Sequence, residues 1–453
     1  MEHNSRVDKV KIVSQVRKIE PSGQEPPNGE EAHGISVGDT ALDVRTAALH
    51  RDDRMSTQTR SRLATMMFMQ YFAMGALLPL LSLYLKEYLG FSPTEIGYVL
   101  AMAAVAAFAS PFTAAHVADR LIRSERLMGI YHLSAASVMV VLSFQHSWLA
   151  FLLTYLLFSL LFVPTSALSN AVAFHHVPNA KRDFGSIRMW GTIGWVAVAW
   201  SFGYFWLRGG AHTSTGDNRL PDALYVTALS GGALGLFLLT FPRRPQPEEK
   251  PEGLGIKKAM VALAHPSLVF FCVLAFFASI SNTFYMQWMS PYLSQIGFRE
   301  EYILPALSLG QLSEIVAMAL LGRALIGIGY KGAMVVGVAA QALRFAIFAF
   351  FPNPALVLVA IPLHGLSWTF FFTAGYIFVD HHSPRGDRAA VQQFYHMLLT
   401  GVGTLLGSLL AGQVGSWALI PGTQDINFTL FWAVPAVLAG LVAIALMAFF
   451  REE

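Results

Sequence analysis

The sequence has little cysteine and little charge. Cys272 is the one cysteine among 453 residues, so the chain cannot form an internal disulfide. Charged residues make up 13% of the chain, about half of the ~25% usual in soluble proteins. The net charge of +3 gives no reason to expect a nucleic-acid partner. Apolar residues are in excess instead, with a hydrophobic fraction of 54% and a mean hydropathy of +0.49. This composition predicts an integral membrane protein.

Enzyme motifs and targeting signals are also missing from the sequence. It contains no metal-ligand spacing, no nucleophile motif and no phosphate-binding loop, so we expect no enzyme, no metal and no cofactor. No charged, apolar and cleavage-site pattern opens the chain, so a cleaved signal peptide is not expected. Residues 1–60 contain Pro26-Pro27 and scattered charges without apolar periodicity, which predicts a disordered cytoplasmic tail.

Apolar segments recur from Leu63 to the end of the chain. Each is long enough to span the membrane as a helix, which takes roughly 20 residues. The twelve predicted spans are 63–85, 95–117, 127–145, 148–174, 186–207, 221–241, 267–293, 302–326, 333–351, 354–379, 389–411 and 427–450. The predicted fold is therefore all-α, with twelve transmembrane helices in two six-helix halves (61–241 and 259–453). A charged, proline-rich cytoplasmic linker (242–258) joins the halves.

Lysine and arginine predict the orientation in the membrane. If the tail is inside, the inner connections hold Arg120, Arg123, Arg126, Lys181, Arg182, Arg188, Arg243, Arg244, Lys250, Lys257, Lys258, Arg323, Lys331, Arg385 and Arg388. The outer connections hold only Lys86, Arg208, Arg219 and Arg299. Because cytoplasmic loops are enriched in these residues, we predict a multi-pass protein of the cytoplasmic (inner) membrane with both termini inside.

A short motif that occurs twice in the sequence favours two related halves. AFHHVPNAKRDFG, with His175 and His176, follows the fourth span, and VDHHSPRGDR, with His381 and His382, follows the tenth. Equivalent loops of two parallel six-helix repeats would produce this repeated motif, and such repeats build a common transporter architecture. Adjacent histidines lack metal-ligand spacing, so we interpret them as interfacial loop residues.

Glu314 is the residue that indicates function most directly. It lies in the apolar stretch YILPALSLGQLSEIVAMALLGRALI, which covers residues 302–326. A charge at membrane depth costs about 2.5 to 3.5 kcal/mol or more, so such residues usually face a water-filled path or a partner. Gln311 precedes Glu314 by three positions and shares its helical face. The pair favours a polar pathway, and the alternative is an acid that only hydrogen-bonds to a neighbouring helix.

Two further polar residues lie in predicted spans. Arg344 is expected either to extend its side chain towards the outer boundary or to pair with a carboxylate that the sequence does not identify. His364 has an intrinsic pKa, about 6.5, that suits a proton relay. Its alternative role is simple hydrogen bonding between helices.

The chain resembles the major facilitator superfamily and, within it, the nucleoside:proton symporter family. VADRLIRSER, with Asp119 and Arg120, is similar in part to the superfamily's conformational loop after the second helix, although Ala115 replaces the usual glycine. SIRMWGTIGWV resembles the family's fifth-helix entry, and SLGQLSEI resembles its eighth-helix motif. The similarity covers roughly residues 63–450.

The resemblance implies a set of substrate-binding residues. They are Arg188, Thr192 and Trp195 in the fifth helix, Asn282 and Tyr285 in the seventh, and Gln311 and Glu314 in the eighth. Trp368 in the tenth span is added as a candidate stacking surface because it is aromatic. The tenth helix departs from the family pattern, because Thr369 stands where an acidic residue implicated in proton coupling is expected. Proton coupling then falls to Glu314 alone, or to Glu314 with His364.

Chemistry agrees with a nucleoside as substrate. A flat base needs aromatic or apolar faces, and its sugar needs a few amides or hydroxyls in place of water. Arg188 and Trp195 could instead be an anchor and a packing residue, and Asn282 could join helices. The predicted function is nucleoside import with a proton by rocking of the two halves, in a monomer whose other partner is membrane lipid. A carrier of sugars or another small polar solute, or a sensor or scaffold without transport, remains the alternative.

Overall fold

The computed structural model describes residues 55–118, 123–177, 180–211, 218–241, 266–384 and 387–451. All of them belong to one compact unit, Met55–Glu453. Within these ranges the chain is helical apart from short connections and one isolated bridge between Leu419 and Ile426. The linker, nearly all of the tail, and the loop residues Asp119 and Arg120 lie outside the described residues.

The helices up to residue 241 form a first group. It comprises α3 (Thr57–Leu77), α4 (Leu81–Leu83), the π-helical η1 (Tyr84–Tyr88), α5 (Pro93–Ala118), α6 (Ser124–Leu142), α7 (Trp148–His176), α8 (Ala180–Val198), η2 (Ala199–Leu207), α9 (Arg208–Ala211) and α10 (Asp222–Leu239). Residues 57–60 of the predicted tail are helical, because α3 begins at Thr57. The Ser56 hydroxyl caps that start by accepting a hydrogen bond from the Thr59 N–H at 3.2 Å.

The helices from residue 266 onward form a second group. It comprises α12 (Pro266–Gln295), α13 (Glu300–Phe350), α14 (Pro354–Ala360), α15 (Leu363–Ser367), η3 (Trp368–Thr373), α16 (Ala374–His382), α17 (Arg388–His396), η4 (Met397–Gly403), α18 (Thr404–Trp417) and α19 (Phe428–Phe449). Several of these follow one another without a loop, so α14 to α16 and α17 to α18 occupy single predicted spans.

Nine helical segments in the described part of the chain are long and apolar enough to cross a membrane. They are Thr57–Tyr88, Pro93–Ser110, Trp148–His176, Asp222–Leu239, Pro266–Gln295, Glu300–Phe350, Pro354–His382, Ala390–Trp417 and Phe428–Phe449. The predicted spans 127–145 and 186–207 are also helical, as α6 and as α8 with η2. These two are more polar, since α6 carries Glu125 and His132 and α8 carries Asp183 and Arg188.

The longest helix, α13, contains two predicted spans. At 1.5 Å per residue, its 51 residues would extend about 76 Å, more than twice the ~30 Å hydrocarbon core of a bilayer. The backbone leaves helical geometry at Gly329, with φ +69° and ψ −178°. Glycine adopts this conformation readily because it has no Cβ. The chain therefore turns at Gly329, and the helices 300–328 and 330–350 match the two predictions.

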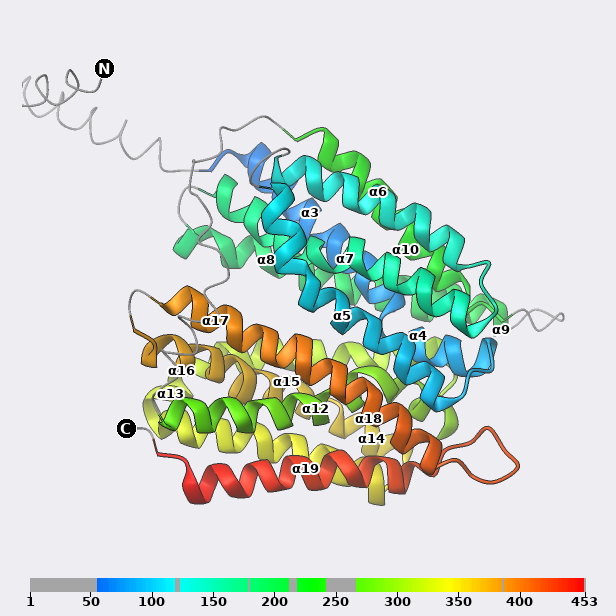
Figure 1. The fold of residues 1–453 in the computed structure, drawn as a ribbon, viewed down its shortest axis with the longest axis vertical. Helices are drawn as coiled ribbons and strands as arrows, with labels where there is room; N and C mark the ends of the chain where they lie inside the picture. The colour runs from blue at the N-terminus through cyan, green and yellow to red at the C-terminus, as the bar shows by residue number, and fades with distance from the viewer. Residues whose placement is uncertain are drawn as a thin grey trace, which may run out of the picture. The chain divides into compact units, whose positions relative to one another are not determined.

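Each group packs mainly within itself, and the largest contacts between the two groups are made by two pairs of helices. In the first group α3 packs on α8 and α10, and in the second α13 packs on α19 and α15. Between the groups α5 runs beside α18, and α13 packs on η2 (Figure 1). A Cβ on Gly97 of α5 would lie 2.9 Å from the Cα of Gly412. Nearby, the hydroxyls of Thr94 and Ser416 are 2.6 Å apart.

The second pair of helices meets at the same end of the bundle. A Cβ on Gly203, near the end of η2, would lie 2.8 Å from the Cβ of Leu304, near the start of α13. The Ser290 hydroxyl donates a hydrogen bond to the Pro79 carbonyl, which also links the two groups. The groups are therefore closed against each other at the end where α5 and α13 begin.

Candidate functional site

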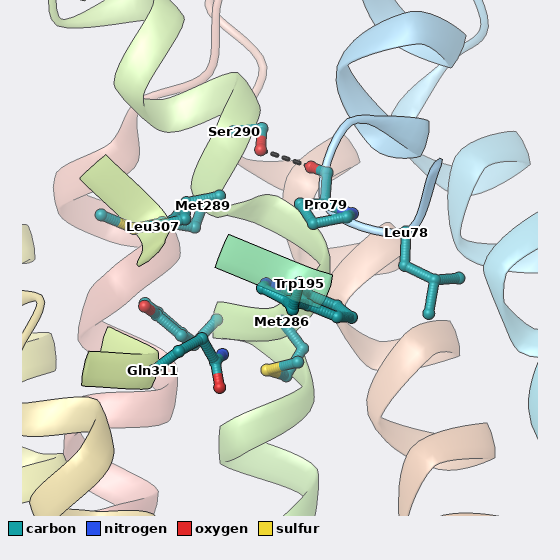
Figure 2. Close-up of a pocket in the computed structure, with 9 residues that line it drawn as sticks. Leu78, Pro79, Trp195, Met286, Met289, Ser290, Leu307 and Gln311 are labelled. Carbon is teal, nitrogen blue, oxygen red and sulfur yellow. Dashed lines mark hydrogen bonds between the residues drawn. The ribbon is translucent and has the colours of Figure 1, made fainter. Parts of the chain in front are cut away.

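A small cavity lies where the two groups of helices face each other (Figure 2). Its lining residues are Leu78, Pro79, Trp195, Tyr285, Met286, Met289, Ser290, Leu307 and Gln311. The volume is about 40 Å³, which is room for roughly three water molecules. Three of the residues predicted to bind substrate, Trp195, Tyr285 and Gln311, therefore share one space. They come from α8, α12 and α13.

Trp195 is held in the cavity wall by the close packing of α8 on α3. A Cβ on Gly194 would meet the carbonyl oxygen of Phe68, and a Cβ on Gly75 would lie 3.2 Å from the Trp195 ring. Both positions need glycine because the two backbones approach so closely. Trp195 is half-buried, and the other labelled lining side chains gather around it in Figure 2. An aromatic face is thus available on the α8 side of the cavity.

Gln311 and Glu314 lie one turn apart on α13. Gln311 is in the cavity wall, whereas Glu314 is partly exposed and has no hydrogen bond or ion pair within the described residues. The charge of Arg188 on α8 acts on the Glu314 carboxyl. The turn that carries Glu314 is fixed, because the Ser313 hydroxyl donates to the Pro362 carbonyl at 2.7 Å. This hydrogen bond links the turn of α13 next to Glu314 to the residue before α15.

Arg188 and Thr192 lie on consecutive turns of α8. The Arg188 guanidinium carbon is 4.1 Å from the ring centroid of Tyr71 on α3, a cation–π contact. Both Arg188 and Thr192 are half-buried. Thr192 makes no side-chain hydrogen bond in the part of the chain that the structure describes, and it is not among the residues that line the cavity.

Tyr285 is the centre of a cluster of rings in the second group. The His364 ring stacks on Tyr285 with centroids 4.8 Å apart. Trp368 continues the cluster, 6.1 Å from His364. Asn282, one turn before Tyr285, is buried, and its Oδ1 has no hydrogen-bond partner among the described residues. The structure thus places Tyr285, His364 and Trp368 in one cluster, with Asn282 one turn before Tyr285 on α12. Their binding roles stay predictions.

Arg344 joins this cluster, although neither expected role for Arg344 is observed. Its side chain is 0% exposed, so it does not reach the outer boundary. It forms no ion pair with a carboxylate within the described ranges. Its guanidinium carbon lies 4.0 Å from the ring centroid of Tyr285 instead.

The apolar lining of the cavity was not predicted. Met286 and Met289 follow Asn282 at helical spacings of four and seven residues, so the sequence did contain a signal for them. Leu78, Pro79 and Leu307 stand among many similar apolar residues, and no local pattern separates them. Tyr71, the partner of Arg188, was also missed.

The fold and this site define a membrane transport protein. The chain is similar to the crystal structure of the nucleoside transporter NupG, with a TM-score of 0.78 and 24% identity over 87% of this chain and 99% of that one. It is also similar to a D-xylose–proton symporter, with a TM-score of 0.67 and 10% identity over 88% and 99% of the two chains. These likenesses establish the fold as that of the major facilitator transporters.

Sequence comparison identifies the family. The model of the nucleoside H+ symporter family matches residues 55–453. The putative nucleoside transporter YegT of Escherichia coli is 30% identical over 87% of this chain and 95% of its own length. The E. coli nucleoside permease NupG is 26% identical over 86% and 96%. The chain therefore belongs to the nucleoside H+ symporter family. The protein is a transporter that couples the movement of nucleosides to that of protons, and it is not an enzyme.

Proposed function

We propose that this protein imports nucleosides across the cytoplasmic membrane with protons, by alternating access of two six-helix halves, and that both termini are cytoplasmic. The observation that supports this most strongly is a cavity lined by Trp195, Tyr285 and Gln311. Glu314 lies one helical turn after Gln311, and the charge of Arg188 acts on its carboxyl. Relatives of the chain are named as a nucleoside permease and a xanthosine permease.

The helices already described support the proposal of twelve spans. The nine long apolar segments, with α6, α8–η2 and the division of α13 at Gly329, account for all twelve. Two related halves are supported by the paired histidines. His176 and His382 each place Nδ1 2.9 Å from the carbonyl oxygen four residues earlier, at the ends of α7 and α16. The same local structure thus closes the corresponding helix in each half.

In this orientation the described conformation is closed to the outside. The close contacts of Gly97 with Gly412, and of Gly203 with Leu304, lie at the end of the bundle that the lysine and arginine distribution places outside. The cavity holds a few water molecules, far less than the ~300 Å³ or more of typical ligand pockets. Substrate binding therefore requires the two halves to separate on one side.

Each predicted residue has a role suited to its position. The rings of Trp195 and Trp368 are the candidate faces on which a base can stack, an interaction worth roughly 1 to 3 kcal/mol. Tyr285 also lines the cavity, while its ring faces contact Arg344 and His364. The amides of Asn282 and Gln311 can hydrogen-bond to the sugar or the base edge. Thr192 adds a hydroxyl from α8.

Glu314 is the proton carrier in this proposal. When it is ionised, the carboxylate is attracted by the Arg188 guanidinium of the opposite half. When it is protonated, that attraction is lost and the acid can hydrogen-bond to substrate or to Gln311. A change of protonation thus alters an interaction between the two halves, which links proton binding to their rocking. His364 is the second candidate because it contacts Tyr285 in the cavity wall.

Uptake of radiolabelled uridine tests the proposal, in cells without their own nucleoside carriers. We expect accumulation that a protonophore abolishes, and competition by unlabelled nucleosides but not by hexoses. Empty-vector cells and the Glu314→Gln variant are the controls. Uptake that hexoses block and nucleosides do not affect would contradict the substrate assignment.

A further inference from the structure

Arg344 carries a buried charge that has no hydrogen bond and no ion pair within the described residues. The side chain is 0% exposed, and Nε, Nη1 and Nη2 have no hydrogen-bond partner. Nearly all buried polar groups in proteins are hydrogen-bonded, and unpaired buried charges are the most costly of them. Replacing a buried charge by an apolar side chain of similar volume is often neutral or stabilising. Arg344 is therefore a poor candidate for a residue that stabilises the fold.

Arg344 instead contacts Tyr285, a residue that lines the cavity. Its guanidinium carbon is 4.0 Å from the Tyr285 ring centroid and 4.9 Å from that of Phe345. Tyr285 lines the cavity, whereas Arg344 does not. A desolvated cation over an aromatic ring is attracted by the electrons of the ring face, which favours one orientation of that ring.

Three helices meet on the Tyr285 ring. Tyr285 belongs to α12, Arg344 to the second part of α13, and His364, which stacks on the same ring, to α15. The cation–π contact and the stacking contact together fix the plane of the ring. Because Tyr285 also lines the cavity, the orientation of its ring sets the space that remains for a flat base.

Building on the proposed function, we propose that Arg344 is a positioning residue for substrate binding, which holds the Tyr285 ring in the orientation that a nucleobase requires. It acts through Tyr285 and does not touch the substrate. This role explains a buried cation that contributes little to stability, since orientation of a binding residue can be favoured even where the fold would be more stable without the charge.

The test is Arg344→Met, which keeps the volume and removes the charge. We expect an unchanged or higher apparent Tm of the purified protein, a maximal uptake rate within about twofold of wild type, and a KM for uridine raised about 3- to 30-fold. Arg344→Lys keeps a cation and should recover part of the affinity. Arg323→Met is the matched control, because Arg323 is an exposed arginine in the first part of α13, and the KM of this variant should not change.

A double-mutant cycle shows whether the effect passes through Tyr285. Tyr285→Leu removes the ring and should raise KM, and adding Arg344→Met should then have no further effect. Tyr285→Phe keeps the ring, so the Arg344 effect should persist there. Additive effects, an unchanged KM, or failure of the Met and Lys variants to fold would each overturn the proposal. If wild-type protein transports no nucleoside, the proposed function fails, and a lowered Tm in Arg344→Met would separately show a structural role.

Discussion

The close approach of α5 and α18 should determine which side of the membrane the protein opens to. In Gly412→Ala the new Cβ would lie 2.8 Å from the Pro93 carbonyl oxygen and 2.9 Å from the Gly97 Cα. Both are backbone atoms and cannot rotate away, so the helices must separate. Overpacking of this kind costs about 1 to 3 kcal/mol. In the proposed cycle only the outward-closed conformation makes this contact, so its population should fall about 5- to 150-fold relative to the outward-open one.

Crosslinking can measure this shift. Thr94 and Ser416 have hydroxyls 2.6 Å apart across the same contact, so cysteines at the two positions should crosslink readily in the closed state. The chain has a single native cysteine, and Cys272→Ser gives a background without thiols. We expect Gly412→Ala to slow the crosslinking and to speed the reaction of the Thr94→Cys thiol with an external reagent.

A glycine with free space around it gives the matched control. A Cβ on Gly440 of α19 would have no neighbouring atom within 4 Å, so Gly440→Ala should crosslink as the parent does. If Gly412→Ala crosslinks at the parental rate while retaining normal expression, the contact does not control opening, and the reasoning is wrong.

Three further predictions concern binding, coupling and folding. Gln311→Ala and Asn282→Ala should each raise the KM for uridine about 5- to 100-fold, since a buried ligand group left unpaired costs roughly 1 to 3 kcal/mol. An unchanged KM in both variants would mean that the two residues only pack between helices. Glu314→Gln cannot titrate and should abolish accumulation driven by a pH gradient while sparing exchange; protonophore-sensitive accumulation in this variant would make His364 the next candidate. In Gly329→Ala a residue with a side chain must adopt φ +69°, which costs about 1 kcal/mol or more. The apparent Tm of the purified protein should therefore fall, and an unchanged Tm would mean that the turn changes its backbone conformation.

The helical fold could be predicted because membrane spans depend on length and hydrophobicity. Segment length identified α12 and α19 within a few residues, and it placed two spans in what proves to be the continuous α13. The turn at Gly329 was not predicted, since Gly322, Gly327 and Gly332 stand nearby and the sequence does not show which one has positive φ.

The site was predictable only where its residues form a local pattern. Gln311 and Glu314 stand out as polar residues at helical spacing in an apolar helix, and the resemblance supplied Trp195 and Tyr285. The environment of Arg344 could not be predicted, because Tyr285 lies 59 positions earlier in the chain and the contact depends on tertiary packing. The binding roles of Arg188, Thr192 and Trp368 stay predictions.

The turn at Gly329 also has a mechanical consequence. One residue joins the helix that carries Glu314 to the helix that carries Arg344, so the connection has no slack. A displacement of the first helix, which packs on η2 of the other group, must be transmitted to the second. The ends of the two helices at Gly329 therefore stay together, and a longer, flexible connection inserted there would let the Glu314 helix move more independently of the Arg344 helix.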